Sequence, residues 1–99
     1  MKNSLTVIKK LPSPWVVGGK PVTEIEVREA SLGDSLEAEK EANPALQPTA
    51  FQVALACQVL VRAGEDVGPF VPAQFKSLKG KQWAVIREAM QEAEKLGED

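Results

Sequence analysis

The sequence predicts an α+β fold: a small N-terminal antiparallel β-hairpin of two or three strands, followed by three to four helices packed as a small helical bundle. Two patterns support this prediction. Residues 22–30 alternate apolar with charged side chains, the period of a strand with one buried face. Residues 81–96 instead place apolar side chains at helical spacing. The 99 residues form a single domain, near the small end for a self-sufficient core.

Three short extended segments are expected before the first helix, at residues 4–11, 15–18 and 22–30. Pro12 and Pro14 are expected to interrupt the first of them, because proline cannot donate to a β-ladder. The pair Gly18-Gly19 predicts the turn of the hairpin, since glycine accepts positive φ. An isolated hairpin is barely stable, so we expect it to pack against the helices.

Four helices are expected after the hairpin, at residues 32–42, 50–63, 72–78 and 81–96. Ser31 is suited to cap the first helix, and Asp34 suits the positive end of its dipole. Leu32 and Leu36 share one face of this helix, while its charged side chains lie mostly in water. This helix is expected to end before Pro44, because the residue that precedes a proline is disfavoured in a helix.

The central feature is the run of residues 51–61, the longest apolar run in the chain. Thr49 and Gln52 have the spacing of a capping box at its start, and Gly64 suits the end of a helix. A helix that is apolar nearly all round must be covered on more than one side. It is therefore either a central core helix or a helix partly covered by another protein, and the sequence leaves both open.

The two last helices carry the remaining large apolar side chains. Pro72 suits the first position of a short helix that would bury Phe75 and Leu78. The final helix places an apolar stripe on one side, made of Trp83, Ile86, Met90 and Ala93. This stripe and the central helix are the two surfaces from which a groove for a partner could be built.

Composition argues against several classes of function. Net charge is −2 and the isoelectric point is about 5.2, so nothing favours a nucleic-acid partner. Histidine is absent, and the single cysteine, Cys57, lies in the apolar run, where it acts as a small hydrophobe. We find no metal-ligand spacing, no phosphate-binding loop and no nucleophile–base pair, and therefore expect no cofactor and no enzymatic activity. Without a charged-then-apolar leader, the chain is expected to be a soluble cytosolic protein.

One local pattern resembles a known family. Arg28-Glu29 ends a strand and Gly33-Asp34 opens an acidic helix, after a lysine-bearing strand, a proline and a Gly-Gly turn. This order is similar to that of the tail assembly chaperones of Mu-like and related contractile-tailed phages. Members often have proline after the Arg-Glu pair, where this chain has Ala30. The resemblance covers roughly residues 5–94, and its specific part is about a dozen residues.

The resemblance implies a non-enzymatic assembly factor. Such proteins bind the long helical tape measure protein in the host cytoplasm, keep it soluble, and help the tail tube protein assemble around it. They are usually absent from the mature virion. Many also have a longer form produced by translational frameshift, in which case this chain would be the short form and the longer form a further partner.

The apolar side chains that could contact such a partner are Trp15, Phe51, Leu55, Phe70, Trp83, Ile86 and Met90. Each of them is also needed for the core of so small a domain, and the core interpretation is favoured for any one of them. Trp15 and Phe70 are the best surface candidates among the seven, because both occur in turn-rich segments.

The four motif residues, Arg28, Glu29, Gly33 and Asp34, are interpreted mainly as structural. Arg28 is expected to pair with a carboxylate, and Asp34 to favour the helix start. Gly33 is expected to permit a close approach between helix and hairpin. The alternative for these residues is a contact surface for a partner.

Two further classes of function remain open from the sequence. A homo-oligomeric adaptor that associates through the apolar helix is the main rival to the chaperone. A helix-turn-helix is less favoured, built from residues 50–63 and 72–78 with a basic cluster at Lys76, Lys79 and Lys81. The acidic balance and the short second helix count against it.

Overall fold

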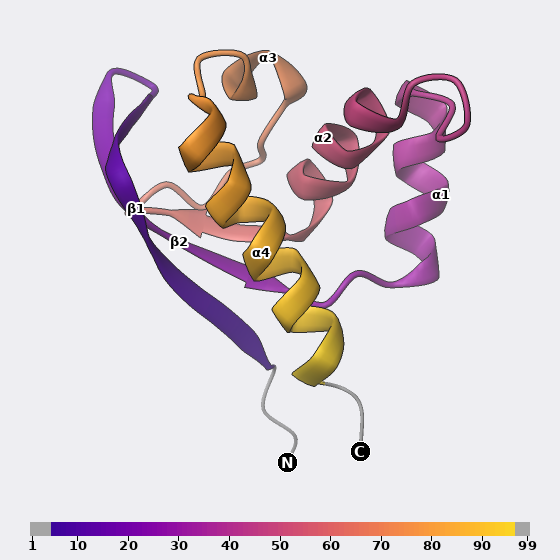
Figure 1. The fold of residues 1–99 in the computed structure, drawn as a ribbon, viewed down its shortest axis with the longest axis horizontal. Helices are drawn as coiled ribbons and strands as arrows, with labels where there is room; N and C mark the ends of the chain where they lie inside the picture. Colours follow the sequence, from indigo (N-terminus) through magenta and orange to yellow (C-terminus); the bar gives the residue numbers. More distant parts are fainter. Residues whose placement is uncertain (1–4, 97–99) are drawn as a thin grey trace.

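The computed structural model describes residues 5–96, and it confirms the α+β fold with a three-stranded antiparallel sheet and four helices. The elements in order are β1 (Thr6–Val17), β2 (Lys20–Arg28), α1 (Leu32–Glu41), α2 (Pro48–Val59), β3 (Leu60–Ala63), α3 (Pro72–Phe75) and α4 (Gly80–Leu96). The strand order in the sheet is β1-β2-β3 (Figure 1). Within the described residues, every helix is too short or too polar to cross a membrane.

Strand β1 is longer than the sequence suggested. The expected interruption at Pro12 and Pro14 is wrong, because one strand runs through both prolines. The pairing with β2 shifts register between Lys10 and Trp15, the stretch that contains them. Since β1 lies at the edge of the sheet and is irregular there, the two missing N–H groups are tolerated.

The predicted turn and the predicted return strand are both confirmed. Gly18 and Gly19 have φ of +59° and +82°, which only glycine adopts without strain. In β2 the alternating pattern buries Ile25 and Val27 completely, while the charged residues between them lie on the opposite face. One face of the sheet therefore carries the core, and the other carries charges.

The third strand comes from an unexpected place. The prediction of helix through residues 60–63 is wrong, because α2 ends at Val59 and the chain continues as β3. Leu60 and Ala63 pair with β2, and the amide of Gly64 donates to the carbonyl oxygen of Glu24 at 2.8 Å. Gly64 therefore follows a strand rather than a helix, with φ of +61°. Local apolar character suits either structure, and pairing with β2 selects the strand.

The start of α2 also differs from the prediction. Gln47 precedes the helix without a side-chain capping bond, and Pro48 occupies the first turn. The expected capping box of Thr49 and Gln52 is therefore wrong. Proline lacks the N–H that a cap would satisfy and has a helical φ, so it starts the helix two residues earlier.

The two C-terminal helices are close to their expected positions. α3 is shorter than predicted, and it buries Phe75 while Leu78, beyond its end, packs partly against the core. α4 begins within one residue of the prediction, and its stripe is largely buried. Because β3 separates α2 from α3, and α3 has only four residues, the helix-turn-helix arrangement is wrong.

Gln82 joins α4 to β1, a contact the sequence did not suggest. Its side chain is 2% exposed and donates to the carbonyl oxygens of Ser13 and Pro14 at 3.1 and 3.0 Å. The side-chain oxygen of Gln82, Oε1, accepts a hydrogen bond from the backbone amide of Lys79 at 2.7 Å, which caps the start of α4. The first turn of α4 is thus fixed beside the irregular part of β1.

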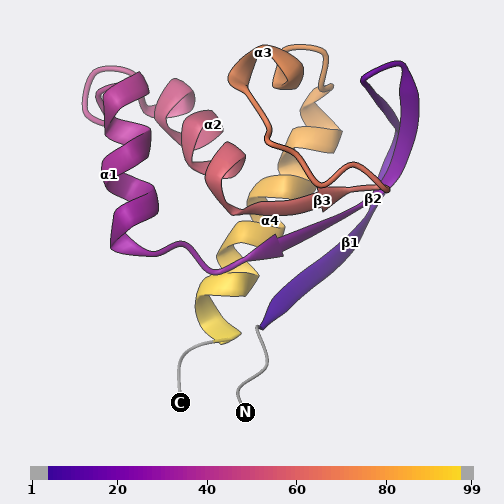
Figure 2. The ribbon, with the colours of Figure 1, turned by 180° about the vertical axis from the view of Figure 1, so that it is seen from behind.

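The helices are arranged in two groups around the sheet. α4 lies across the apolar face of β1 and β2, while α1 and α2 run in opposite directions side by side (Figures 1 and 2). The core between them includes Trp15, Val27, Ile86 and Ala93, all at most 1% exposed. This arrangement leaves a groove where the two groups meet.

Candidate functional site

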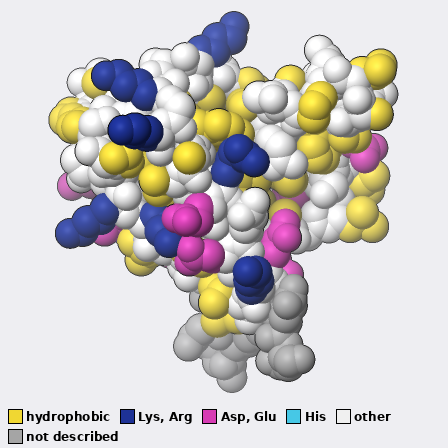
Figure 3. Space-filling view, viewed as in Figure 1, with side chains coloured by type: hydrophobic (Ala, Val, Ile, Leu, Met, Phe, Trp, Pro, Cys, Tyr) yellow, Lys and Arg dark blue, Asp and Glu magenta, His cyan; other side chains and the backbone are white. Residues whose placement is uncertain are grey.

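The surface between α2 and α4 contains two adjoining hollows of about 200 and 330 Å³, which we call the α2/α4 groove. Gln52 of α2 and Arg87 of α4 line both hollows. The remaining lining residues are Pro48, Thr49 and Trp83 in one hollow, and Leu55, Met90, Gln91 and Glu94 in the other. Figure 3 shows apolar side chains interleaved with both kinds of charge on this face.

Three of the seven candidate partner-binding residues line this groove. Leu55 and Met90 are each 7% exposed and form its floor, and Trp83 is half-buried at one end. Phe51 is half-buried against the core and lines neither hollow, and Ile86 is fully buried. α2 is therefore mainly a core helix with one side at a groove.

Trp15 and Phe70, the two better surface candidates, are buried, at 1% and 7% exposed, so the core interpretation holds for both. The indole N–H of Trp15 donates to Ser77 Oγ at 3.2 Å, and its ring meets the ring of Phe75 edge-on at 5.3 Å. Turn-rich sequence around an aromatic residue does not reveal a partner 62 positions away. The ring of Trp15 therefore cannot contact another protein in this conformation, and Phe70 lines neither hollow of the α2/α4 groove.

The motif residues form a clamp, which we call the Arg28 clamp. The guanidinium of Arg28 donates to both carboxylate oxygens of Asp34, at 2.7 and 3.0 Å. It also donates to the carbonyl oxygens of Gln58 at 2.8 Å and Glu29 at 3.0 Å. One side chain thus joins the end of β2, the start of α1 and the end of α2, which supports the structural interpretation of the motif.

Asp34 also completes the cap of α1, as predicted. The Ser31 amide donates to Asp34 Oδ2 at 2.8 Å, and Ser31 Oγ accepts from the Asp34 amide at 3.2 Å. The hydrogen bonds from the Arg28 guanidinium are the main reason that the pKa of Asp34 falls to about 2, with partial burial opposing and Ser31 assisting. The carboxylate is therefore ionised throughout the neutral range.

The expected close approach at Gly33 is wrong. A Cβ atom there would meet only Ser31 Oγ, at an ordinary contact distance of 3.5 Å. Glu29 is exposed and takes part in the clamp through its backbone oxygen. Of the four motif residues, only Arg28 and Asp34 contribute side chains to the clamp.

A further hollow, of about 270 Å³, lies where α1, α2 and α3 meet. Its walls are mainly apolar, from Ala42, Val53 and Phe75, with Glu41 and Lys76 at its rim. This hollow could not be predicted from the sequence, because it depends on the placement of the short helix α3.

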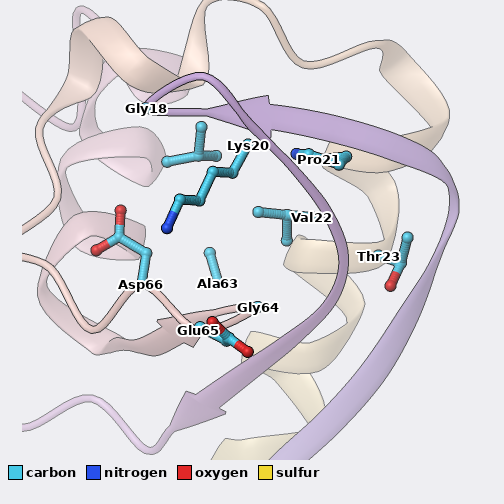
Figure 4. A pocket seen from close by; sticks show the side chains of 10 residues that line it. Gly18, Lys20, Pro21, Val22, Thr23, Ala63, Gly64, Glu65 and Asp66 are labelled. Carbon is cyan, nitrogen blue, oxygen red and sulfur yellow. The ribbon is translucent and has the colours of Figure 1, made fainter.

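A larger hollow, of about 650 Å³, lies between the β1–β2 turn and the loop after β3. Lys20 extends into it from the turn, across from Asp66, and Glu65 lies on the same loop (Figure 4). Mixed charges of this kind do not favour a ligand of either sign.

Several leucines are exposed on and beyond α1. The buried face of this helix uses Ala38, while Leu32 and Leu36 are 76% and 53% exposed. Leu46, in the turn that follows, is 81% exposed. Small residues face α2, so the two leucines of α1 share a face that is open to solvent.

Residues 5–96 provide no evidence for a metal-binding site or a reactive thiol. No three His, Cys, Asp or Glu side chains in this part of the chain are grouped so that they could hold a metal ion. Burial raises the pKa of the Cys57 thiol to about 11, with a smaller contribution from Glu41, so the thiol is protonated at neutral pH.

Comparison of the chain with protein-family models, curated proteins and solved structures finds no match.

Proposed function

We propose that the chain is a tail assembly chaperone of a contractile-tailed phage, which binds the tape measure protein and keeps it soluble during tail tube assembly. The observation that carries this proposal is the α2/α4 groove, with Leu55, Met90 and Trp83 between two helices. A tape measure is a long helix whose apolar stripes stay exposed until the tube covers them. Binding of an amphipathic helix in a groove between helices is a common recognition mode.

The resemblance around the Arg28 clamp supports the same function. In this chain the clamp fixes the start of α1 and the end of α2 to the sheet that carries α4. It therefore contributes to the relative placement of the two groove walls. A motif of this kind is useful to a binding protein even though it contacts no partner itself.

The proposal includes the cellular setting implied by the resemblance. The chain acts in the host cytoplasm, without catalysis or a cofactor, and is absent from the mature virion. Its partners are the tape measure protein, the tail tube protein and a frameshifted longer form of itself, with no nucleic acid and no membrane.

A homo-oligomeric adaptor is the second candidate, and the exposed leucines favour it. Leu32, Leu36 and Leu46 would be covered if two copies met through α1 and the turn after it. This candidate predicts a concentration-dependent dimer in sedimentation experiments, and no effect on the solubility of a tape measure protein.

Co-expression with the tape measure protein encoded nearby tests the main proposal. The chain is expected to increase the soluble fraction of the tape measure and to co-purify with it. Trp83→Ala should weaken both effects, because it removes the apolar wall of one hollow. Leu36→Ala, an exposed leucine outside the groove, is the matched control. Unchanged solubility and no co-purification with the unaltered chain would contradict the proposal.

A further inference from the structure

Four charged side chains of α4 form two pairs with different surroundings. Glu88 and Glu92 face β1, where the ammonium of Lys9 lies 3.5 and 2.6 Å from their carboxylate oxygens. Arg87 and Glu94 line the α2/α4 groove instead. Neither of these two side chains forms an ion pair or hydrogen bond with any residue from 5 to 96.

The spacing between Arg87 and Glu94 equals the seven-residue repeat of an amphipathic helix that could lie in the groove. They are one heptad apart on α4, which corresponds to about 10.5 Å along the helix axis. Met90, on the groove floor, lies between them in sequence. The groove therefore presents a positive charge, an apolar side chain and a negative charge in order along one wall.

The amides of the groove walls are available as well. Gln52 of α2 and Gln91 of α4 both line the groove, and their side chains form no hydrogen bond within the described chain. Polar groups of this kind suit the rim of a binding surface rather than a packed core.

We propose that the α2/α4 groove selects its partner helix by charge: an acidic residue opposite Arg87 and a basic residue one heptad away, opposite Glu94, flanking the apolar residue that covers Met90. This inference rests on the proposed function and specifies the chemistry of its partner. An apolar floor accepts any apolar stripe, whereas two opposite charges exclude helices with like charges at these points.

Binding of designed helical peptides tests the charge selection. Each peptide has about three heptads with an apolar stripe and differs only at two positions one heptad apart, which hold Glu and Lys, two Glu, or two Lys. Affinity is measured by fluorescence anisotropy with a labelled peptide. The unaltered chain should bind the Glu–Lys peptide about two- to fivefold more tightly than either of the others, as expected for solvent-exposed ion pairs.

Charge reversal in the protein should change the preferred peptide. Arg87→Glu should favour the peptide with two Lys, and Glu94→Lys should favour the peptide with two Glu. Lys95→Glu and Glu39→Lys change net charge by the same amounts at exposed positions outside the groove, and should leave the order of affinities unchanged. All four sites are exposed, so folding should be retained, and circular dichroism checks this.

Four outcomes would overturn the inference. Equal affinity for all three peptides, or equal effects of the groove and control variants, would exclude charge selection but leave helix binding intact. Failure to bind any peptide with an apolar stripe would contradict both this inference and the groove-based function. Dissociation of a self-associated form by Arg87→Glu in sedimentation experiments would identify a second copy of this chain as the occupant.

Discussion

At the scale of single residues, the Arg28 clamp joins β2, α1 and α2 through one side chain. Its guanidinium has the planar, forked geometry that matches both oxygens of Asp34 while a further N–H reaches Gln58 O. Two elements that are adjacent in the sequence, β2 and α1, meet the more distant α2 at this one group. The sequence predicted that Arg28 pairs with a carboxylate and that Asp34 starts a helix, because both are local preferences. The contact with α2 could not be predicted, since it depends on how the chain folds back.

Arg28→Lys should lower the free energy of unfolding by roughly 1–3 kcal/mol, since an ammonium cannot replace the fork and the bond to Gln58 together. Urea denaturation followed by circular dichroism measures the change. Arg87→Lys is the matched control, because Arg87 is exposed and unpaired within residues 5–96, and should change stability by less than about 0.5 kcal/mol. Equal effects of the two substitutions would show that the clamp contributes nothing specific.

The clamp also predicts a pH dependence. The pKa of Asp34 is lowered to about 2 from its ordinary value of 3.8, so the folded state favours the ionised carboxylate. The resulting stabilisation is complete above about pH 4 and is lost as the pH falls toward 2. Unfolding free energies of the wild type and Asp34→Asn should therefore differ at pH 6 and converge toward pH 2. A constant difference across that range would contradict this account.

At the scale of elements, β3 shows that the local sequence pattern does not always predict whether a segment is helix or strand. Residues 51–61 are apolar without a clear period, so a helix was predicted throughout. The chain changes from helix to strand after Val59, because β2 offers an unpaired edge to Leu60 and the residues that follow. By contrast, the final helix could be predicted closely, since its stripe has a clear helical period and its buried face meets the sheet.

Charged contacts on the outer face of the sheet hold β3 in register. Arg62 Nε lies 2.8 Å from Glu26 Oε1, and Arg62 Nη2 lies 3.0 Å from Glu24 Oε1. Arg62→Gln should lower the free energy of unfolding, because it removes a two-carboxylate network rather than one exposed pair. Thermal unfolding at low and high salt measures this, and the loss should shrink at high salt. A loss that does not depend on salt would indicate packing instead of charge.

At the scale of the whole molecule, the α2/α4 groove exists because two groups of elements meet without filling the space between them. The sequence could predict that Leu55, Trp83 and Met90 are apolar and lie on helices. It could not predict which apolar residues lie beside the groove and which, like Trp15 and Phe70, lie inside. That division depends on contacts between distant segments, such as the packing of Trp15 against the ring of Phe75.

The two tryptophans provide the most direct test of the central claim, that the α2/α4 groove receives a helix from another protein. Their indole N–H signals are resolved in an NMR spectrum of the nitrogen-15-labelled chain, and a fragment of the tape measure protein is added. The account predicts that the Trp83 signal shifts with added fragment, while Trp15, buried and bonded to Ser77, stays in place. Shifts confined to the amides of Leu32 and Leu36, or no shift at Trp83 at saturation, would contradict it.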